Sequence, residues 1–579
     1  MRKCWLLLIL LMSSLLAWGQ TVVFSHESGF YADTFSLTMQ QVPADSTLTI
    51  HYTFNGNAPT ECDAQYSGPI RLSPECYSRS GIYRVPTVPE DRWFQPERVE
   101  RIIVVRAALY DTNGYRRSPV TTHSYLIDSL LGRRISLPVV SLCTDSLSLF
   151  DHDTGLFIPG WYHNPHFAYS TGNYFQRGRH WERDAAFAYL DPDGGKLLQD
   201  CGLRVHGNSQ RVLVQKGLSL YARREYGARD FRYPFFDQRS RGSYRRLVLR
   251  PWSTSWSSAG IEDWLCQHLA DSLRVDNLAT RPVVLFINGE YWGIYFLEEK
   301  ADEHYVEERH GIPDKEVDLL AYWGGEVENG NAARWDTLFQ WLEKANLQKE
   351  RDYAYLASQV DVDALMDYMM LQILILNDDW PVSNARQWAP LNGKWRWIFF
   401  DGDGALSMFT DRSLILDYMT YNLVVPNRHT SLQSTLLFRR LLANKQFLER
   451  SMARLREIAN TQFTYRRSSA LLNDIVKQVE NEVPYQIRRF DKPSSMVRWR
   501  IAVETIDDFL RTEPEAMVNE YAQYFNLSVP QSDNFVVYDL YGRQVLSSES
   551  REEMLQVLPQ GIYFLRMDSG EIKKMEIKD

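Results

Sequence analysis

The stretch that decides the fold covers 372–404, where two apolar segments each end in acidic side chains. The first reads Gln372-Ile-Leu-Ile-Leu-Asn377-Asp378-Asp379, and Asn384 follows five residues after Asp379. The second is the aromatic run 395–400, which leads into Asp401-Gly-Asp403-Gly. Carboxylates at the point where a buried element reaches the surface are costly to fold around unless they bind a ligand. We therefore expect the rest of the chain to present this stretch as a binding site.

The spacing Asp379-x-x-x-x-Asn384 is that of a protein-kinase catalytic loop. In that layout the aspartate meets the acceptor hydroxyl, the asparagine binds a metal ion, and Asp401 is the second metal-binding carboxylate. Asp378 lies beside Asp379, so both are candidates for the catalytic carboxylate, and Asp403 is a further candidate metal ligand. These side chains offer only hard oxygen atoms, which Mg²⁺ prefers. The pattern predicts Mg²⁺ (or Mn²⁺) as cofactor and ATP as co-substrate.

Two other sites would use the same aspartates. Asp401-Gly-Asp403-Gly resembles the start of a calcium loop, but the fifth and twelfth positions of an EF-hand would here be Ala405 and Arg412, which cannot supply the expected oxygen ligands. Asp401-x-Asp403 also matches the Asp-x-Asp metal site of glycosyltransferases.

Length, charge and the N-terminus limit the class of protein. A chain of 579 residues predicts two to four domains, and its net charge of −9 argues against nucleic-acid binding. Residues 1–20 have the basic, apolar and small-residue regions of a signal peptide. An N-terminal anchor helix is the alternative, although the apolar run is short for a membrane span. We expect an exported protein with no membrane-spanning segment after signal removal, in which Cys62 and Cys76 are candidates for a disulfide.

Short alternating runs with Asn-Gly turns predict an all-β, immunoglobulin-like sandwich over 21–130. The motifs Ser28-Gly-Phe-Tyr and Tyr52-Thr-Phe-Asn-Gly56 resemble the immunoglobulin-like domain at the C-terminus of chitobiases. That resemblance implies a spacer or a binding module, with a glycan as a possible partner. Residues 131–200 are expected to form a connecting hairpin and loop that pack on the next domain.

The segment 201–525 predicts a two-lobed α+β domain. Its first half carries strand patterns, including a hairpin around Asn288-Gly289 with a type I′ turn. Its second half has apolar spacing of period 3.6, which predicts helices over 431–459, 465–483 and 495–525.

Several motifs of this domain occur in the order found in the CotH family, the atypical kinases similar to spore coat protein H. They are Arg204-x-His206-Gly-Asn208-Ser209-x-Arg211, Gln215-Lys216-Gly, Asn288-Gly-Glu-Tyr-Trp-Gly, Asn377-Asp-Asp379…Asn384 and Trp397-Ile-Phe-Phe-Asp401-Gly-Asp403-Gly. The resemblance implies a protein-kinase-like fold in which Lys216 contacts the ATP phosphates and Glu299 is a candidate for its ion-pair partner. It also implies a phosphate-side loop made of Arg204, His206, Asn208, Ser209 and Arg211. Two of these residues have simpler interpretations, since His206 could be a hydrogen-bonded structural histidine and Lys216 an ordinary surface lysine.

The last fifty residues change character once more. "YDLYGRQV" (538–545) and "LPQGIYFLR" (558–566) resemble the C-terminal sorting domain of the type IX secretion system of Bacteroidota, here a small all-β module over 530–579. An ordinary β-hairpin cap is the alternative. The resemblance implies the type IX secretion machinery as a partner and a final location at the cell surface or outside the cell.

Two functions of different classes follow from these observations. The first is an exported CotH-like atypical protein kinase, which transfers the γ-phosphoryl group of ATP to hydroxyls of a protein substrate. The second is a non-catalytic surface adhesion or matrix protein that uses the kinase-like domain as a scaffold and the sandwich to bind a glycan or a protein.

Overall fold

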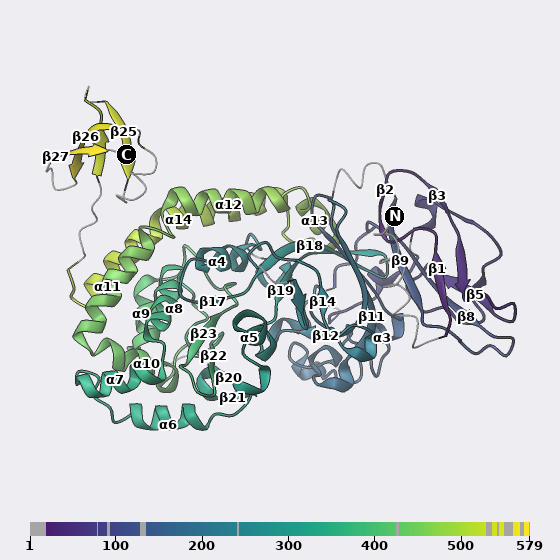
Figure 1. Cartoon of the computed structure of the whole chain (residues 1–579), viewed down its shortest axis with the longest axis horizontal. Coiled ribbons are helices and arrows are strands. Elements are labelled where there is room, and N and C mark those ends of the chain that lie inside the picture. The colour runs from purple at the N-terminus through teal and green to yellow at the C-terminus, as the bar shows by residue number, and fades with distance from the viewer. Residues whose placement is uncertain are drawn as a thin grey trace, which may run out of the picture. The chain divides into compact units, whose positions relative to one another are not determined.

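The computed structural model describes residues 19–77, 79–89, 93–127, 135–239, 242–256, 258–423, 428–528, 535–540, 543–548, 558, 560–567 and 572–577. Most of the predicted signal peptide, residues 1–18, therefore lies outside the described residues. The chain divides into two compact units (Figure 1). The first comprises Met1–Trp264, Leu278–Asp314 and Asn473–Val503, and the second Leu265–Asn277, Lys315–Leu472 and Glu504–Asp579.

The first unit begins with the β-rich region that the sequence predicts. Its main sheet has the order β2-β9-β8-β5-β6, and the pairs β1-β4 and β3-β7 complete the layer opposite. The strands are β1 Thr21–Phe24, β2 Gly29–Tyr31, β3 Phe35–Leu37, β4 Met39–Val42, β5 Thr49–Thr53, β6 Ala64–Gln65, β7 Ile70–Leu72, β8 Ile103–Tyr110 and β9 Thr121–Ile127. Side chains from several of these strands, among them Val22, Leu37, Leu72, Val105 and Tyr125, form one buried core.

A closed barrel of seven strands follows, in the order β10-β11-β12-β13-β16-β19-β18. The strands are β10 Val139–Cys143, β11 Arg183–Leu190, β12 Lys196–His206, β13 Gly217–Tyr221, β16 Arg246–Pro251, β18 Thr280–Ile287 and β19 Glu290–Glu299. Parallel pairing of β10 with β18 closes the barrel, and closure leaves no unpaired strand edge. The segment 131–200, expected to be a connection, thus supplies two whole strands and part of a third to the barrel wall.

The hairpin at Asn288-Gly289 is confirmed. Asn288 has φ 48° and Gly289 has φ 80°, and positive φ at both central residues is the mark of a type I′ turn. The Asn288 amide also bonds Thr144 through both its oxygen and its nitrogen, which anchors the turn to the chain beyond β10.

The second unit contains a five-stranded sheet of order β17-β23-β22-β20-β21. Its strands are β17 Asp276–Asn277, β20 Val317–Ala321, β21 Glu326–Asn329, β22 Arg386–Pro390 and β23 Arg396–Phe399. Helix α8 (Val362–Leu374) packs on β23, and nearly every residue of α8 is buried. This helix and β23 are the two apolar segments that end in acidic residues.

The remaining helices are α3 Ser146–Phe150, α4 Glu262–Ala270, α5 Glu303–His310, α6 Ala333–Leu342, α7 Glu350–Gln359, α9 Arg412–Thr420, α10 Leu432–Leu442, α11 Lys445–Ala459, α12 Tyr465–Val479, α13 Val483–Phe490 and α14 Met496–Tyr524. The helix expected over 431–459 is two helices. Asn444 separates them because its side chain accepts the Phe447 N–H and so caps α11. The helical character predicted for this part of the chain is otherwise confirmed.

Near the C-terminus, β24 Phe535–Tyr538, β25 Gln544–Ser548, β26 Gly561–Met567 and β27 Ile572–Ile577 form an antiparallel sheet of order β25-β24-β26-β27. The assignment of this sheet to a sorting domain stays a prediction. No helix among the described residues combines the length and apolar character needed to cross a membrane. The disulfide suggested for Cys62 and Cys76 is wrong, since both are free thiols.

Candidate active site

The first acidic loop leaves α8 through a left-handed residue, Leu376, with φ 49°. Asn377 is buried and fixes the turn: its Nδ2 donates to Gln372 Oε1 at 2.9 Å, and its Oδ1 accepts the Asp379 N–H at 3.2 Å. This arrangement brings Asp378 and Asp379 to the surface directly after a buried helix.

The second acidic loop follows β23 and starts at Asp401, which also has a positive φ of 63°. Backbone hydrogen bonds join the two loops, from Asp378 N to Gly404 O at 3.3 Å and from Leu406 N to Ile375 O at 2.8 Å. A Cβ on Gly404 would lie 2.7 Å from Asp378 Oδ1, so a larger residue at this position would require the Asp378 side chain to move. The fold thus brings 377–384 and 401–406 together, as the sequence predicts.

Asp379 has a defined environment on both carboxylate oxygens. Asn384 Nδ2 donates to Oδ2 at 3.1 Å, and His429 Nδ1 lies 3.7 Å from Oδ1. Partial burial raises the pKa of Asp379 above its usual value, and the negative charge of Asp401 raises it further, while His429 and the Asn384 hydrogen bond oppose the shift. The pKa of Asp378 is also raised, mainly by burial. A carboxylate that repels its neighbour is stabilised by any cation bound between them.

His429 belongs to this site although no sequence motif points to it. Arg428 Nε lies 3.2 Å from His429 Nε2, so the arginine donates to that nitrogen and the imidazole proton is assigned to Nδ1, facing Asp379. The ring stacks on Tyr418 with centroids 5.6 Å apart, and His429 O accepts the Val382 N–H. The histidine is therefore held against the loop that carries Asp379 and Asn384.

The side chains around Asp379 offer carboxylate and amide oxygens, which are the ligand type that Mg²⁺ prefers. Among the described residues, three His, Cys, Asp or Glu ligand atoms lie within 4.8 Å of one another only at His304, Glu307 and Asp314. The acidic loops therefore offer one ion at most two carboxylates, to be completed by an amide oxygen and water. Mg²⁺ commonly binds in this way, through one or two carboxylates and several waters.

The group His304, Glu307 and Asp314 already surrounds a protein cation. Arg245 Nη1 lies 3.0 Å from His304 Nδ1, 3.0 Å from Glu307 Oε2 and 3.1 Å from Asp314 Oδ2. The guanidinium neutralises this cluster, which leaves no position for a metal ion.

The structure places Lys216 in a role different from the expected one. The side chain is fully buried, and Nζ donates to Thr87 O at 3.0 Å, Arg211 O at 2.9 Å and Leu213 O at 2.9 Å. Nζ also lies 4.1 Å from the centre of the Tyr174 ring. Burial lowers the pKa of Lys216 well below its usual value, while the three carbonyls and the ring favour the ammonium form. All three N–H groups are used inside the protein, so neither a phosphate contact nor a surface lysine fits this position.

The predicted ion pair between Lys216 and Glu299 is wrong. Glu299 pairs with Arg239, whose Nη2 lies 2.7 Å from Oε2, and accepts the Ala279 N–H at 2.7 Å. Glu299 thus fixes the chain before β18 and does not orient the lysine.

The residues of the predicted phosphate-side loop also form hydrogen bonds with other groups of the protein. Arg204 donates twice to Glu182 Oε2, at 2.8 and 2.6 Å, and His206 Nδ1 lies 2.9 Å from Ser219 Oγ. Arg211 is buried and donates to three backbone carbonyls, and burial lowers its pKa to about 10. Asn208 Oδ1 accepts from Arg177 at 3.2 Å, and Ser209 begins a short 3₁₀ turn. The contacts of His206 agree with its simpler interpretation as a structural histidine.

Comparisons with known families give two matches. A family model described as CotH kinase protein matches residues 203–517, which is more than half of the chain. A second model, described as Fn3 associated, matches residues 38–125, inside the sandwich that resembles the chitobiase domain. No curated protein matches the chain.

Proposed function

Because this chain belongs to the CotH kinase protein family, we propose that it is an atypical protein kinase that transfers the γ-phosphoryl group of ATP to hydroxyls of a protein substrate. The observation that carries the proposal is the pair Asp379 and Asn384, joined by a hydrogen bond and set beside the loop of Asp401. Phosphoryl transfer needs a carboxylate to orient the acceptor hydroxyl and oxygen ligands for a metal on the phosphates. In this proposal, residues of one unit supply both groups.

Asp379, and not its neighbour Asp378, is the proposed catalytic carboxylate. Its Oδ2 is fixed by Asn384 and its Oδ1 faces His429, so the group has one orientation in which to accept the substrate hydroxyl. Asp378 instead has its Oδ1 next to Gly404, where the two loops approach each other. Asp378 is thus better suited to support the loops.

The proposed ligands of Mg²⁺ (or Mn²⁺) are Asn384, Asp401 and Asp403. When bound, the ion would neutralise charge on the ATP phosphates. The protein's own part is to hold these oxygens on two loops whose backbones are joined to each other. The left-handed φ values of Asn384 (54°) and Asp401 (63°) support a functional role, because such strain in non-glycine residues is concentrated at functional sites.

Export belongs to the same proposal. It is supported by the signal-like residues 1–20 and by the resemblance of 530–579 to a type IX sorting domain. The expected location is the cell surface or the medium, and the sandwich is a proposed module for binding a glycan or a protein partner.

One observation favours the second function, a non-catalytic surface protein. Three cations are expected from the sequence to bind phosphate, namely Lys216, Arg204 and Arg211. Each of them donates hydrogen bonds to protein groups instead. If no other cation binds the nucleotide phosphates, the kinase-like domain acts as a scaffold and the sandwich binds the glycan or protein partner.

Nucleotide binding separates the two functions. A kinase predicts that ATP raises the melting temperature of the full chain only when Mg²⁺ or Mn²⁺ is present. The same shift with metal alone would indicate a metal site without a nucleotide site, and no shift under any condition would overturn the kinase proposal.

A further inference from the structure

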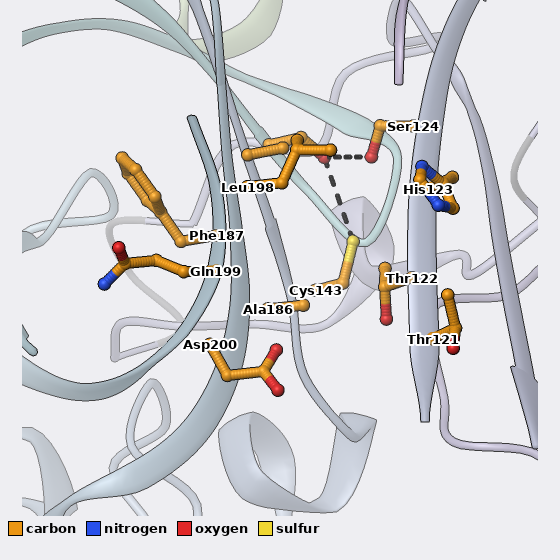
Figure 2. A pocket seen from close by; sticks show the side chains of 12 residues that line it. Thr121, Thr122, His123, Ser124, Cys143, Ala186, Phe187, Leu198, Gln199 and Asp200 are labelled. Carbon is orange, nitrogen blue, oxygen red and sulfur yellow. Dashed lines mark hydrogen bonds between the residues drawn. The ribbon is translucent and has the colours of Figure 1, made fainter. Parts of the chain in front are cut away.

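A cavity of ≈ 220 Å³ lies in the first unit, between strand β9 of the sandwich and the outer face of barrel strands β10, β11 and β12 (Figure 2). The strand register explains why space remains there. Ala186 pairs with Asp200 and Ala188 pairs with Leu198 across β11 and β12, so these four side chains share the face toward β9. Two alanines on that face leave room that larger residues would fill.

The Asp200 carboxylate points into this cavity (Figure 2). Within the part of the chain that the structure describes, it accepts no hydrogen bond and forms no ion pair. The Asp200 side chain is exposed to solvent by its surface area, yet the protein atoms packed around the carboxylate partly desolvate it. This desolvation raises the pKa of Asp200 to about 6, with a smaller contribution of the same sign from Asp184. An acidic group held in this way gains stability from a ligand that brings positive charge.

The nearest protein cation does not fill that role. Arg106 lowers the pKa of Asp200 by its charge, but its guanidinium donates to Gly56 O at 2.8 Å, Thr122 Oγ1 at 3.2 Å and Asp145 Oδ1 at 3.3 Å. His123 also lines the cavity, and burial lowers its pKa to about 4, which leaves the ring neutral near pH 7. Neither side chain supplies a counter-charge in direct contact with Asp200.

The other polar groups of the lining mostly offer acceptors. Thr121 Oγ1 gives its hydrogen to Val22 O, and Thr122 Oγ1 accepts from Arg106, so lone pairs remain on the threonines. Ser124 and Ser141 bond each other at 2.9 Å, and the Ser141 hydroxyl lies 3.8 Å from the Cys143 sulfur. Burial raises the pKa of Cys143, so its thiol is neutral. A ligand that fits this lining carries hydrogen-bond donors.

We propose that this cavity is a binding site for a small organic molecule with a primary ammonium group, which pairs with the Asp200 carboxylate. The volume is below the 300–1,000 Å³ of typical ligand pockets, so a ligand of few heavy atoms fits. The site is independent of the acidic loops and of the proposed kinase activity.

The test uses the full chain and two probes of similar size, ethanolamine as the ammonium and ethylene glycol as its neutral counterpart. Binding is measured by saturation-transfer NMR at about pH 7.5, above the pKa of Asp200. We expect ethanolamine to bind and ethylene glycol not to bind. Asp200→Asn should weaken ethanolamine binding by about tenfold or more.

Two further variants make the result specific. Asp184→Asn removes the same charge from the same face of the sheet without touching the cavity lining, and should change the affinity by less than about threefold. Ala186→Leu keeps Asp200 but fills the cavity, and should abolish binding. Equal binding of both probes, or ethanolamine binding that survives both Asp200→Asn and Ala186→Leu, would overturn the proposal. Thermal unfolding of each variant confirms that a loss of binding is not a loss of fold.

Discussion

The side-chain amide of Asn384 donates a hydrogen bond to Asp379 Oδ2 across 3.1 Å, within a five-residue interval of the chain. The bond fixes one oxygen of the aspartate and, at the same time, directs the amide oxygen of Asn384 away from it. In the proposed function, Asp379 would meet the acceptor hydroxyl and the Asn384 oxygen would bind a metal ion.

Replacing His429 should reduce turnover more than nucleotide binding. His429→Ala removes the group that faces Asp379 Oδ1, and loss of such a supporting contact typically costs about 10–100-fold in activity. We expect this loss to appear as a lower kcat, while KM for ATP changes by less than about threefold. Steady-state phosphotransfer kinetics measure both constants.

Two amide variants serve as matched controls for His429. The amide of His429→Asn can stand where Nδ1 stands and should restore part of kcat, whereas His429→Gln places its amide near Nε2 and should not. Equal activity of both variants, or a change confined to KM, would show that His429 does not position Asp379.

Asp401→Asn should abolish the stabilisation that ATP with Mg²⁺ gives to the wild-type protein. A ligand at about 100 times its Kd stabilises by about 2.7 kcal/mol, and the variant should lose most of this because a metal ligand has lost its charge. The protein without ligand should be as stable as wild type or slightly more so, since Asp401 repels Asp379. Differential scanning calorimetry with and without nucleotide compares the stability of wild type and Asp401→Asn. A full nucleotide-dependent shift in the variant would remove Asp401 from the metal site.

Lys216→Met should destabilise the protein and leave nucleotide binding intact. The substitution keeps the length of the side chain but leaves three buried carbonyl groups without a donor, at a cost of about 2–4 kcal/mol. Denaturant unfolding gives the free energy, and calorimetric titration gives the ATP affinity under native conditions. An ATP affinity that falls by tenfold with unchanged stability would restore the original expectation for Lys216.

The sandwich should lose stability on acidification because of His123. Its Nδ1 accepts the Ser28 N–H, and burial lowers its pKa from 6.5 to about 4. Between pH 6.5 and pH 4 the unfolded chain binds a proton at His123 that the folded chain does not bind. The contribution of neutral His123 to the free energy of unfolding is therefore complete above pH 6.5 and is lost as the pH falls toward 4, by up to about 3 kcal/mol. Hydrogen exchange of β9 amides reports the opening free energy.

His123→Asn supplies the control for this pH dependence, because its amide oxygen can still accept the Ser28 N–H but does not titrate. The opening free energy of β9 should then depend less steeply on pH between 6.5 and 4. An identical slope in wild type and variant would assign the acid sensitivity to other groups.

The acidic loops could be predicted from the sequence because their signal is local. Apolar runs that end in Asn377-Asp-Asp379 and Asp401-Gly-Asp403 identify the two segments. Helix α8 and strand β23 end just before these acidic residues and so place them in the following loops. Lys216 could not be interpreted in this way. Its partners Thr87 and Tyr174 lie far away in sequence, and nothing in Gln215-Lys216-Gly217 says that the ammonium faces the interior.

The same limit explains the barrel and His429. Barrel closure depends on parallel pairing of β10 with β18, strands separated by more than a hundred residues. His429 reaches Asp379 through a turn that has no motif of its own, so only the folded chain reveals the contact. Features set by local pattern were accessible from the sequence, and features set by distant contacts were not.

The most direct measurement of the central claim is transfer of labelled γ-phosphate from ATP to protein by the purified full chain, with Mg²⁺ or Mn²⁺. We expect metal-dependent transfer that falls by about 10²–10⁴-fold in Asp379→Asn, the range expected for loss of a positioned base. Asp378→Asn, which makes the same change one residue away, should keep most of the activity. Transfer that survives Asp379→Asn, or that is lost only in Asp378→Asn, would contradict the assignment, and absence of transfer in the wild-type protein would favour the non-catalytic function.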